Sequence, residues 1–133
     1  MPYVFEFDWQ NRIVRVRLYG RVTDSELRDI YRQGFKVYFQ TEPIAGLMDV
    51  SGITSIDVSA TTVRELAKAT PIALQESLPR VVIAPSAETY ALARLFETLG
   101  KATRPNLHVV RTEAEAFEII GVKKPTFGPM HPM

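Results

Sequence analysis

The stretch IAGLMDV, residues 44–50, carries the clearest architectural signal in the sequence. Its apolar side chains follow one another almost without interruption, which is typical of a strand buried on both faces. A second run of this kind fills residues 80–84 and is closed by Pro85. Strands buried on both faces belong to parallel sheets covered by helices, so the two runs predict an α/β domain in which they lie parallel.

Before the first of these strands, the sequence predicts a β-hairpin. Aromatic side chains occupy every second position of residues 3–8, apolar side chains do so in residues 14–19, and Gln10 and Asn11 supply a turn between them. The turn gives a register that places the apolar set on one face and the charged set on the other. This register pairs Phe5 with Val16, Glu6 with Arg15 and Phe7 with Val14.

Capping residues mark the starts of the predicted helices. Thr23 and Thr112 are each followed three positions later by glutamate, which is the capping-box pattern, and then by apolar side chains at helical spacing. Ser59 and Ser86 stand at the expected starts of two further helices. With a last strand at residues 107–110, these elements predict a mixed central sheet, in which an N-terminal hairpin precedes parallel strands, with about four helices mainly on one face.

Two segments are expected to lack regular structure. Residues 51–57 must link a strand to the helix that follows, so we expect a loop there. Residues 123–133 contain three prolines and little apolar periodicity, which predicts a disordered tail after a single domain of residues 1–122. The aromatic strand at residues 3–8 is expected at a sheet edge, beside Trp9, and such an edge predicts a homodimer.

Composition narrows the classes of function. The 133 residues include 16 Lys and Arg against 15 Asp and Glu, and this balance argues against a nucleic-acid partner. Cysteine is absent and histidine occurs twice, which excludes thiol catalysis and Cys- or His-rich metal sites. No stretch approaches the ~18 apolar residues of a membrane span, so we expect a cytoplasmic protein without membrane insertion.

Several stretches share their order of elements with one known family. They are RVRLYGRVTDSELRDI (residues 15–30), GLMDVSGITSIDVSA (residues 46–60), PRVVIAPSAETYALARLFETLG (residues 79–100) and VVRTEAEAFEIIG (residues 109–121). Together they resemble the STAS domains of bacterial anti-sigma factor antagonists, and in particular the divergent SpoIIAA-like branch of lone domains. The resemblance implies an α/β binding module with no enzymatic activity and no cofactor.

The resemblance also implies a site. In the family, a loop serine is phosphorylated by a kinase that is also its binding partner, so the expected partner is a kinase or an anti-sigma-like protein. By position this serine is Ser59, with Asp57 as the preceding acidic residue, while Val58 and Ala60 replace the motif's Ser and Gly. The residues alone equally fit a plain helix cap at Ser59, for which Ser59→Asp would be nearly neutral for stability.

Two other interpretations remain open. Asp49 and Asp57 flank the expected loop at the carboxyl edge of the sheet, where they could form a carboxylate pair for metal or proton chemistry. No third ligand accompanies them, so turn and cap roles are favoured and neither metal nor catalysis is predicted. The alternative function is a carrier of a small apolar ligand or lipid, similar to the CRAL-TRIO carriers. It rests on aromatic residues that could line a pocket, namely Phe35, Tyr38, Phe39, Tyr90 and Phe96.

Overall fold

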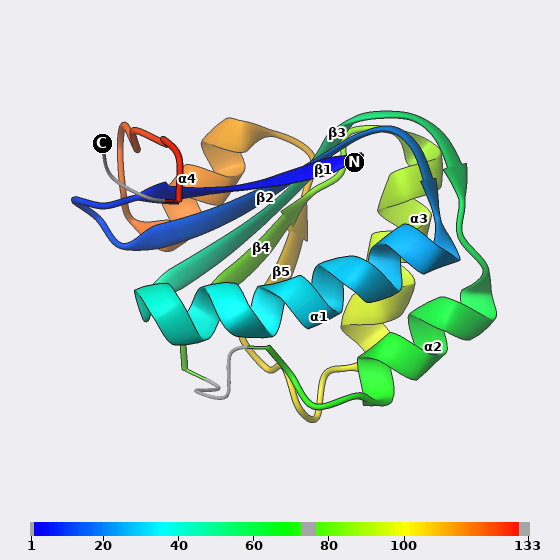
Figure 1. Ribbon diagram of the computed structural model, residues 1–133. Coiled ribbons are helices and arrows are strands. Elements are labelled where there is room, and N and C mark those ends of the chain that lie inside the picture. The colour runs from blue at the N-terminus through cyan, green and yellow to red at the C-terminus, as the bar shows by residue number, and fades with distance from the viewer. Residues whose placement is uncertain (1, 73–76, 131–133) are drawn as a thin grey trace.

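The computed structural model describes residues 2–72 and 77–130, which form five strands and four helices (Figure 1). In chain order these are β1 (Tyr3–Asp8), β2 (Ile13–Thr23), α1 (Asp24–Thr41), β3 (Ala45–Asp57), α2 (Ala60–Lys68), β4 (Arg80–Ile83), α3 (Ala87–Leu99), β5 (Leu107–Val110) and α4 (Glu113–Ile120). None of the helices in these two ranges is long and apolar enough to cross a bilayer.

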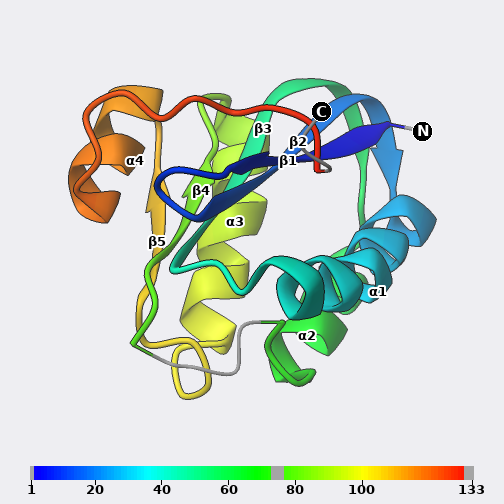
Figure 2. The ribbon, with the colours of Figure 1, turned by 60° about the vertical axis from the view of Figure 1, so that its left-hand side comes forward.

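The strands form one mixed sheet whose spatial order, β1-β2-β3-β4-β5, is also the order of the chain. β1 and β2 are antiparallel, and every later pairing is parallel. Figure 2 shows α1, α2 and α3 on one side of the sheet and α4 on the other. The predicted α/β architecture, with helices mainly on one face, is therefore confirmed.

Two apolar clusters account for these layers, because successive side chains of a strand point to opposite faces. Val82 packs in the cluster beneath α1 and α3, together with Val16 and Ile30. Its neighbour Val81 packs in the opposite cluster, with Ala116 of α4. The central strands are thus buried on both faces, as the uninterrupted apolar runs predict.

The hairpin has the predicted register. Phe5 lies opposite Val16, and Glu6 lies opposite Arg15. Both Arg15 and Arg17 donate to the Glu6 carboxylate, at 2.9 and 2.6 Å, so the positive side chains of β2 are neutralised from β1. The polar face of the hairpin is therefore a set of cross-strand ion pairs.

The predicted loop at residues 51–57 is wrong, because β3 continues as a strand to Asp57. The pairing of β3 with β4 ends at Asp49, but β2 extends to Thr23. β3 therefore continues to pair with β2, with register shifts, as far as the Thr23–Asp57 pair. Figure 1 shows both strands bending together toward the starts of α1 and α2. Gly52 permits the close approach, since a Cβ there would lie 2.9 Å from the carbonyl oxygen of Leu18.

The predicted disordered tail also differs from the structure, in which the segment after α4 returns across the sheet to β1 (Figure 2). Phe7 and Gly128 exchange two backbone hydrogen bonds of 3.0 and 3.1 Å. The Arg15 guanidinium lies 4.0 Å from the centre of the Phe127 ring, and this ring packs on the cluster beneath α4. Prolines prevent regular structure here, but Phe127 still has apolar surface to bury. Residues 131–133 lie outside the described residues.

A buried carboxylate ties the hairpin turn to this C-terminal segment. Asp8 is 1% exposed and accepts hydrogen bonds from the backbone N–H groups of Gln10, Asn11 and Thr126 at 2.9–3.0 Å, and from the Asn11 side chain. Burial alone would raise the pKa of Asp8, but these donors outweigh it and hold the pKa below its usual range. Asp8 is therefore ionised and central to both segments.

A buried arginine caps the C-terminal end of α2. Arg104 is 4% exposed and donates to the carbonyl oxygens of Leu66, Ala67 and Ala69, at 2.8–3.2 Å. It also donates to the hydroxyl of Tyr31 at 3.1 Å. The last carbonyls of a helix lack hydrogen-bond donors within the helix and lie at the negative end of its dipole. A guanidinium there donates to these carbonyls and also places a positive charge at the negative end.

Candidate functional site

Ser59 occupies the N-cap position of α2, immediately after the end of β3. Its backbone is extended, and its Oγ accepts a hydrogen bond from the backbone N–H of Thr62 at 3.2 Å. The residue is exposed. The helix cap expected from the sequence is therefore present, and its hydroxyl is accessible from solvent.

The carboxylate of Asp24, the first residue of α1, binds Ser59 at two points. The Ser59 backbone N–H donates to Oδ1 at 2.8 Å, and the Ser59 hydroxyl donates to Oδ2 at 3.0 Å. The hydrogen bond from the Ser59 N–H, supported by that from its hydroxyl, outweighs burial and holds the pKa of Asp24 below its usual range. Sequence reasoning missed Asp24, which lies 35 positions away.

The signal that leads to Asp24 is the pairing of β2 with β3. Thr23 and Asp57 are partners at the ends of these two strands, so the helices that follow start side by side. A sequence analysis that extended β3 to Asp57 would have placed Asp24 next to the α2 cap. The predicted loop at residues 51–57 concealed this relationship.

Two ion pairs flank the Ser59–Asp24 contact. Asp57, which the sequence places before Ser59, pairs with Arg21 of β2 at 2.9 Å, and both side chains are well exposed. Arg28 of α1 donates to the Thr62 hydroxyl at 3.1 Å and approaches Glu65 at 3.3 Å. The start of α2 is thus surrounded by three carboxylates and two guanidiniums.

The structure does not bring Asp49 to this site. Asp49 and Asp57 are eight residues apart within one strand, which corresponds to roughly 25 Å of extended chain. Asp49 instead accepts hydrogen bonds from the Ser51 backbone and hydroxyl, at 2.9 and 2.6 Å. The carboxylate-pair interpretation is therefore wrong. Within residues 2–72 and 77–130, no group of three or more His, Asp or Glu side chains is placed to hold a metal ion.

A second serine cap provides an internal comparison. Ser86 caps α3 and accepts from the Thr89 N–H at 3.2 Å, the same arrangement that Ser59 makes with Thr62. Both serines begin a Ser-Ala-x-Thr sequence. Among the described residues, no carboxylate is hydrogen-bonded to Ser86, and the nearby Arg111 donates to the Pro85 carbonyl at 2.9 Å. The link to a carboxylate of another helix therefore distinguishes Ser59.

Comparison with known proteins identifies the fold. No family model and no curated protein sequence matches the chain. Its architecture is nevertheless that of the STAS-type anti-sigma factor antagonists. The chain is similar in fold to SpoIIAA, an anti-sigma factor antagonist, whose unphosphorylated form has 14% sequence identity and a TM-score of 0.60 over 92% of this chain and 99% of that chain. The phosphorylated form of SpoIIAA, a Bacillus cell fate determinant, has 18% identity and a TM-score of 0.52, over 87% and 96% of the two chains. The SpoIIAA-like fold predicted from the sequence is confirmed.

Proposed function

We propose that this protein is a non-enzymatic, cytoplasmic regulatory module that binds another protein through the start of α2, and that phosphorylation of Ser59 controls this binding. One observation carries the proposal. The exposed Ser59 hydroxyl donates to Asp24 at 3.0 Å, so phosphorylation of this hydroxyl would alter the contact between the starts of α1 and α2. The similarity in fold to SpoIIAA, whose structures include an unphosphorylated and a phosphorylated form, supports the proposal.

The chemistry of the site explains how such control would work. A kinase would transfer the terminal phosphoryl group of a nucleoside triphosphate to Oγ, which loses its proton. The product carries about two negative charges and has no hydroxyl proton to donate to Asp24. It would repel Asp24 and Asp57, while the free N–H groups at the start of α2 and the Arg28 guanidinium would attract it. Phosphorylation would therefore exchange the Asp24 contact for contacts within α2 and with Arg28.

The class of partner follows from the same surface. Three carboxylates and two guanidiniums surround Ser59, so the site has no excess of positive charge for a nucleic acid. A protein surface with charges of both signs would complement it, and a change of about two charge units would strongly alter such an interface. We infer a kinase or an anti-sigma-like protein as the partner.

The test compares two serines with the same cap geometry. Tagged wild-type protein, Ser59→Asp and Ser86→Asp are used as baits in extract from the native organism, after circular dichroism shows that each is folded. Captured proteins and the phosphorylation state of the wild-type bait are identified by mass spectrometry.

The proposal predicts a protein that wild type and Ser86→Asp capture equally and that Ser59→Asp loses, with phosphate found on Ser59. Equal capture by all three folded baits would contradict it. If phosphate were found only on residues other than Ser59, control by phosphorylation of Ser59 would be refuted, while binding through the start of α2 would not.

A further inference from the structure

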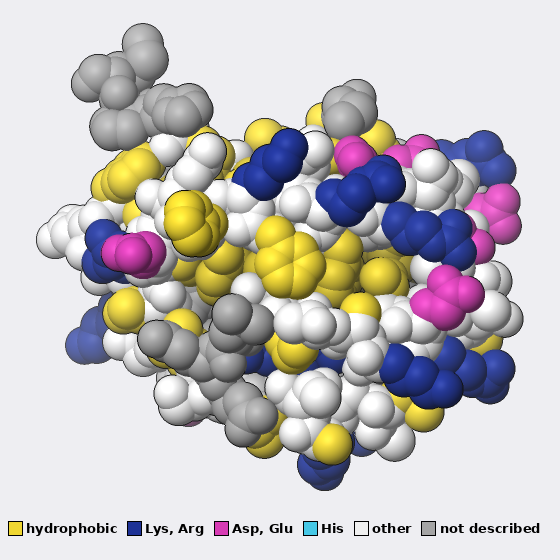
Figure 3. Space-filling view, turned by 60° about the horizontal axis from the view of Figure 1, so that its bottom comes forward, with side chains coloured by type: hydrophobic (Ala, Val, Ile, Leu, Met, Phe, Trp, Pro, Cys, Tyr) yellow, Lys and Arg dark blue, Asp and Glu magenta, His cyan; other side chains and the backbone are white. Residues whose placement is uncertain are grey.

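A cavity of about 200 Å³ lies between the sheet and the helices α1, α2 and α3. Apolar side chains form nearly all of its wall, among them Val16, Ile30, Val50, Val82 and Phe96. Figure 3 shows hydrophobic side chains gathered around a recess on the side of the molecule where α1 and α2 lie. This cavity is separate from Ser59, which does not line it.

The size of the cavity is unusual and limits its occupant. Protein cores are packed as densely as organic crystals, and voids larger than a water molecule are few. An apolar cavity of about 150 Å³ stays dry and binds benzene, whereas pockets for drug-sized ligands measure about 300–1,000 Å³. A volume of about 200 Å³ therefore suits one aromatic ring with a small substituent. It does not suit a lipid chain, which the sequence-based carrier interpretation included.

Two of the five aromatic residues that suggested a pocket line this cavity, Tyr38 and Phe96. Phe35 and Phe39 are instead 42% and 88% exposed on α1. Tyr90 packs beneath the Arg111 guanidinium, 4.8 Å from the ring centre. The pocket is therefore formed mostly by aliphatic side chains, which come from the sheet and from the helices that cover it.

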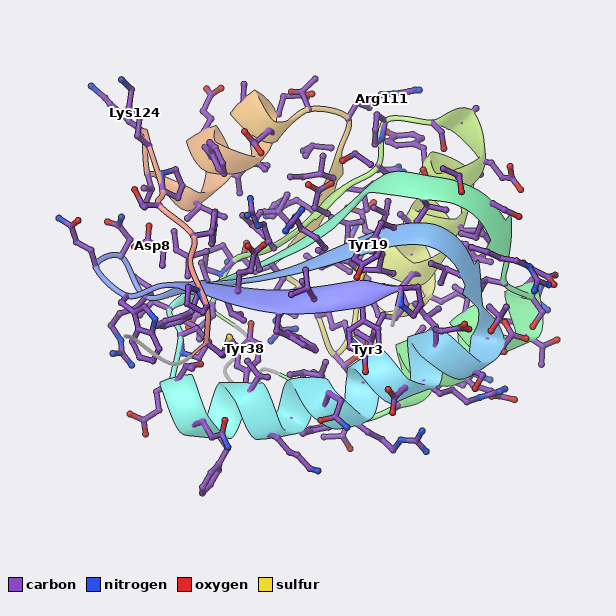
Figure 4. All side chains as sticks on the ribbon, turned by 45° about the horizontal axis from the view of Figure 1, so that its top comes forward. Tyr3, Asp8, Tyr19, Tyr38, Arg111 and Lys124 are labelled. Atoms are coloured by element: carbon purple, nitrogen blue, oxygen red, sulfur yellow. The ribbon has the colours of Figure 1, made fainter. Side chains whose placement is uncertain are left out.

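One polar group faces this apolar space in a form that suits a ligand. Figure 4 shows Tyr38 between α1 and the sheet, and a Cβ on Gly46 of β3 would lie only 2.5 Å from its hydroxyl oxygen. Burial raises the pKa of Tyr38 to about 12, so the phenol is neutral and can donate. No hydrogen bond to another described residue engages this hydroxyl. Four other polar residues line the cavity. Tyr31 and Arg104 are bonded to each other, Thr89 takes part in the Ser86 cap, and Arg80 places a positive charge near Tyr38.

We propose that the cavity binds a single-ring aromatic molecule with one hydrogen-bonding substituent, of the size of phenol. The ring would lie among the aliphatic side chains of β2, β3 and β4, and the substituent would bond to the Tyr38 hydroxyl. A hydrogen bond from phenol would engage the Tyr38 hydroxyl, to which no other described residue is hydrogen-bonded, and ring burial would fill the void.

The first test uses phenol and toluene, which differ by a hydroxyl in place of a methyl group. Each is titrated into protein with ¹³C-labelled methyl groups, and dissociation constants are taken from the chemical shifts of cavity methyls, such as those of Val16 and Val82. We expect saturable 1:1 binding of both. Tyr38→Phe should reduce the preference for phenol over toluene by about 2- to 10-fold, the net value of one hydrogen bond. Absence of saturation up to the solubility limits would overturn the proposal, and an unchanged preference in Tyr38→Phe would overturn the role of the hydroxyl.

The second test fills the cavity. Ala93 of α3 lines it, whereas Ala91 of the same helix is exposed, so Ala93→Leu and Ala91→Leu form a matched pair. Binding should weaken at least about tenfold in Ala93→Leu and stay unchanged in Ala91→Leu, since filled volume excludes the ring. If Ala93→Leu does not unfold cooperatively, the smaller Ala93→Val takes its place. Undiminished binding in a folded Ala93 variant would place the ligand elsewhere and refute the assignment.

Discussion

Ser59 and Asp24 fasten the first residues of α2 to the first turn of α1 by two hydrogen bonds, of 2.8 and 3.0 Å. The contact is possible because β2 and β3 end at paired residues, so the two helices start side by side. An N-cap serine ordinarily stabilises only its own helix. Here the same side chain also links two helices, and a substitution at Ser59 acts on both.

The first prediction concerns the charge at this contact. Ser59→Asp would place a second carboxylate about 3 Å from that of Asp24. We therefore expect it to destabilise the domain by about 1–2 kcal/mol, although aspartate is itself a good N-cap. This replaces the nearly neutral effect expected from the sequence alone. Urea unfolding gives the free energies.

A double-mutant cycle isolates the cause. Asp24→Asn removes the like charge, so Ser59→Asp should cost less in that background than in wild type, by about 1 kcal/mol. Equal costs in the two backgrounds would show that Asp24 does not interact with position 59. Ser86→Asp, at a cap without a carboxylate partner, should be close to neutral.

The second prediction concerns pH and Asp8. Because the folded state lowers the pKa of Asp8, its contribution to stability is complete above the ordinary carboxyl pKa of about 4 and is lost as pH falls through the lower, folded value. Asp8→Asn should cost about 2–3 kcal/mol at pH 7. It should also flatten the loss of stability below about pH 4, as measured by urea unfolding from pH 7 to pH 2.5. Asp49→Asn is the control, and an equally steep acid profile in Asp8→Asn would contradict the role of Asp8.

The third prediction concerns Arg104. Arg104→Met leaves the carbonyls at the end of α2 without donors, so we expect a loss of about 3 kcal/mol or more. Arg104→Lys should recover less than half of this, because an ammonium cannot reproduce the guanidinium fork. The exposed Arg94 provides the control, and Arg94→Met should change the free energy of unfolding by less than about 0.5 kcal/mol. A loss in Arg104→Met no larger than that would contradict the prediction.

The fourth prediction concerns the edge of β1. A chain ending at Pro125 lacks the Thr126, Phe127 and Gly128 contacts, so it should be about 3 kcal/mol less stable. Its Phe7 backbone groups become free to pair with a second copy. We expect sedimentation velocity to show dimers at concentrations about tenfold lower than for the full chain. Equal self-association of the two chains would show that the C-terminal segment does not protect the edge.

The features that were predictable from the sequence depend on neighbours along the chain. The cap residues Thr23, Ser59, Ser86 and Thr112 all begin helices, because a cap needs only the next three residues. The hairpin register was predictable for the same reason, since a short turn fixes it. Most of the apolar run at residues 44–50 lies in β3, which begins at Ala45, because a strand buried on both faces favours apolar side chains at successive positions, whereas Ile44 precedes the strand and is exposed.

The features that were missed depend on distant partners. Residues 51–57 have no strong strand pattern of their own, and they are a strand because β2 offers them an edge. The C-terminal segment is ordered by Asp8, which lies 118 positions from Thr126. Asp24 and the cavity likewise result from elements that meet only in the folded protein. Pattern and propensity carry no information about such contacts.

The contacts between Asp8 and Thr126 and between Phe7 and Gly128 have a consequence for biosynthesis. Every other strand of the sheet can pair with the strand translated just before it, because spatial order follows chain order. The C-terminal segment that bonds to β1, in contrast, emerges from the ribosome roughly 6–24 s after β1 itself, at 5–20 residues per second. During that interval the nascent chain exposes an unpaired edge. Premature termination before residue 126 would leave the edge open permanently, so truncated translation products should need chaperones more than the finished protein does.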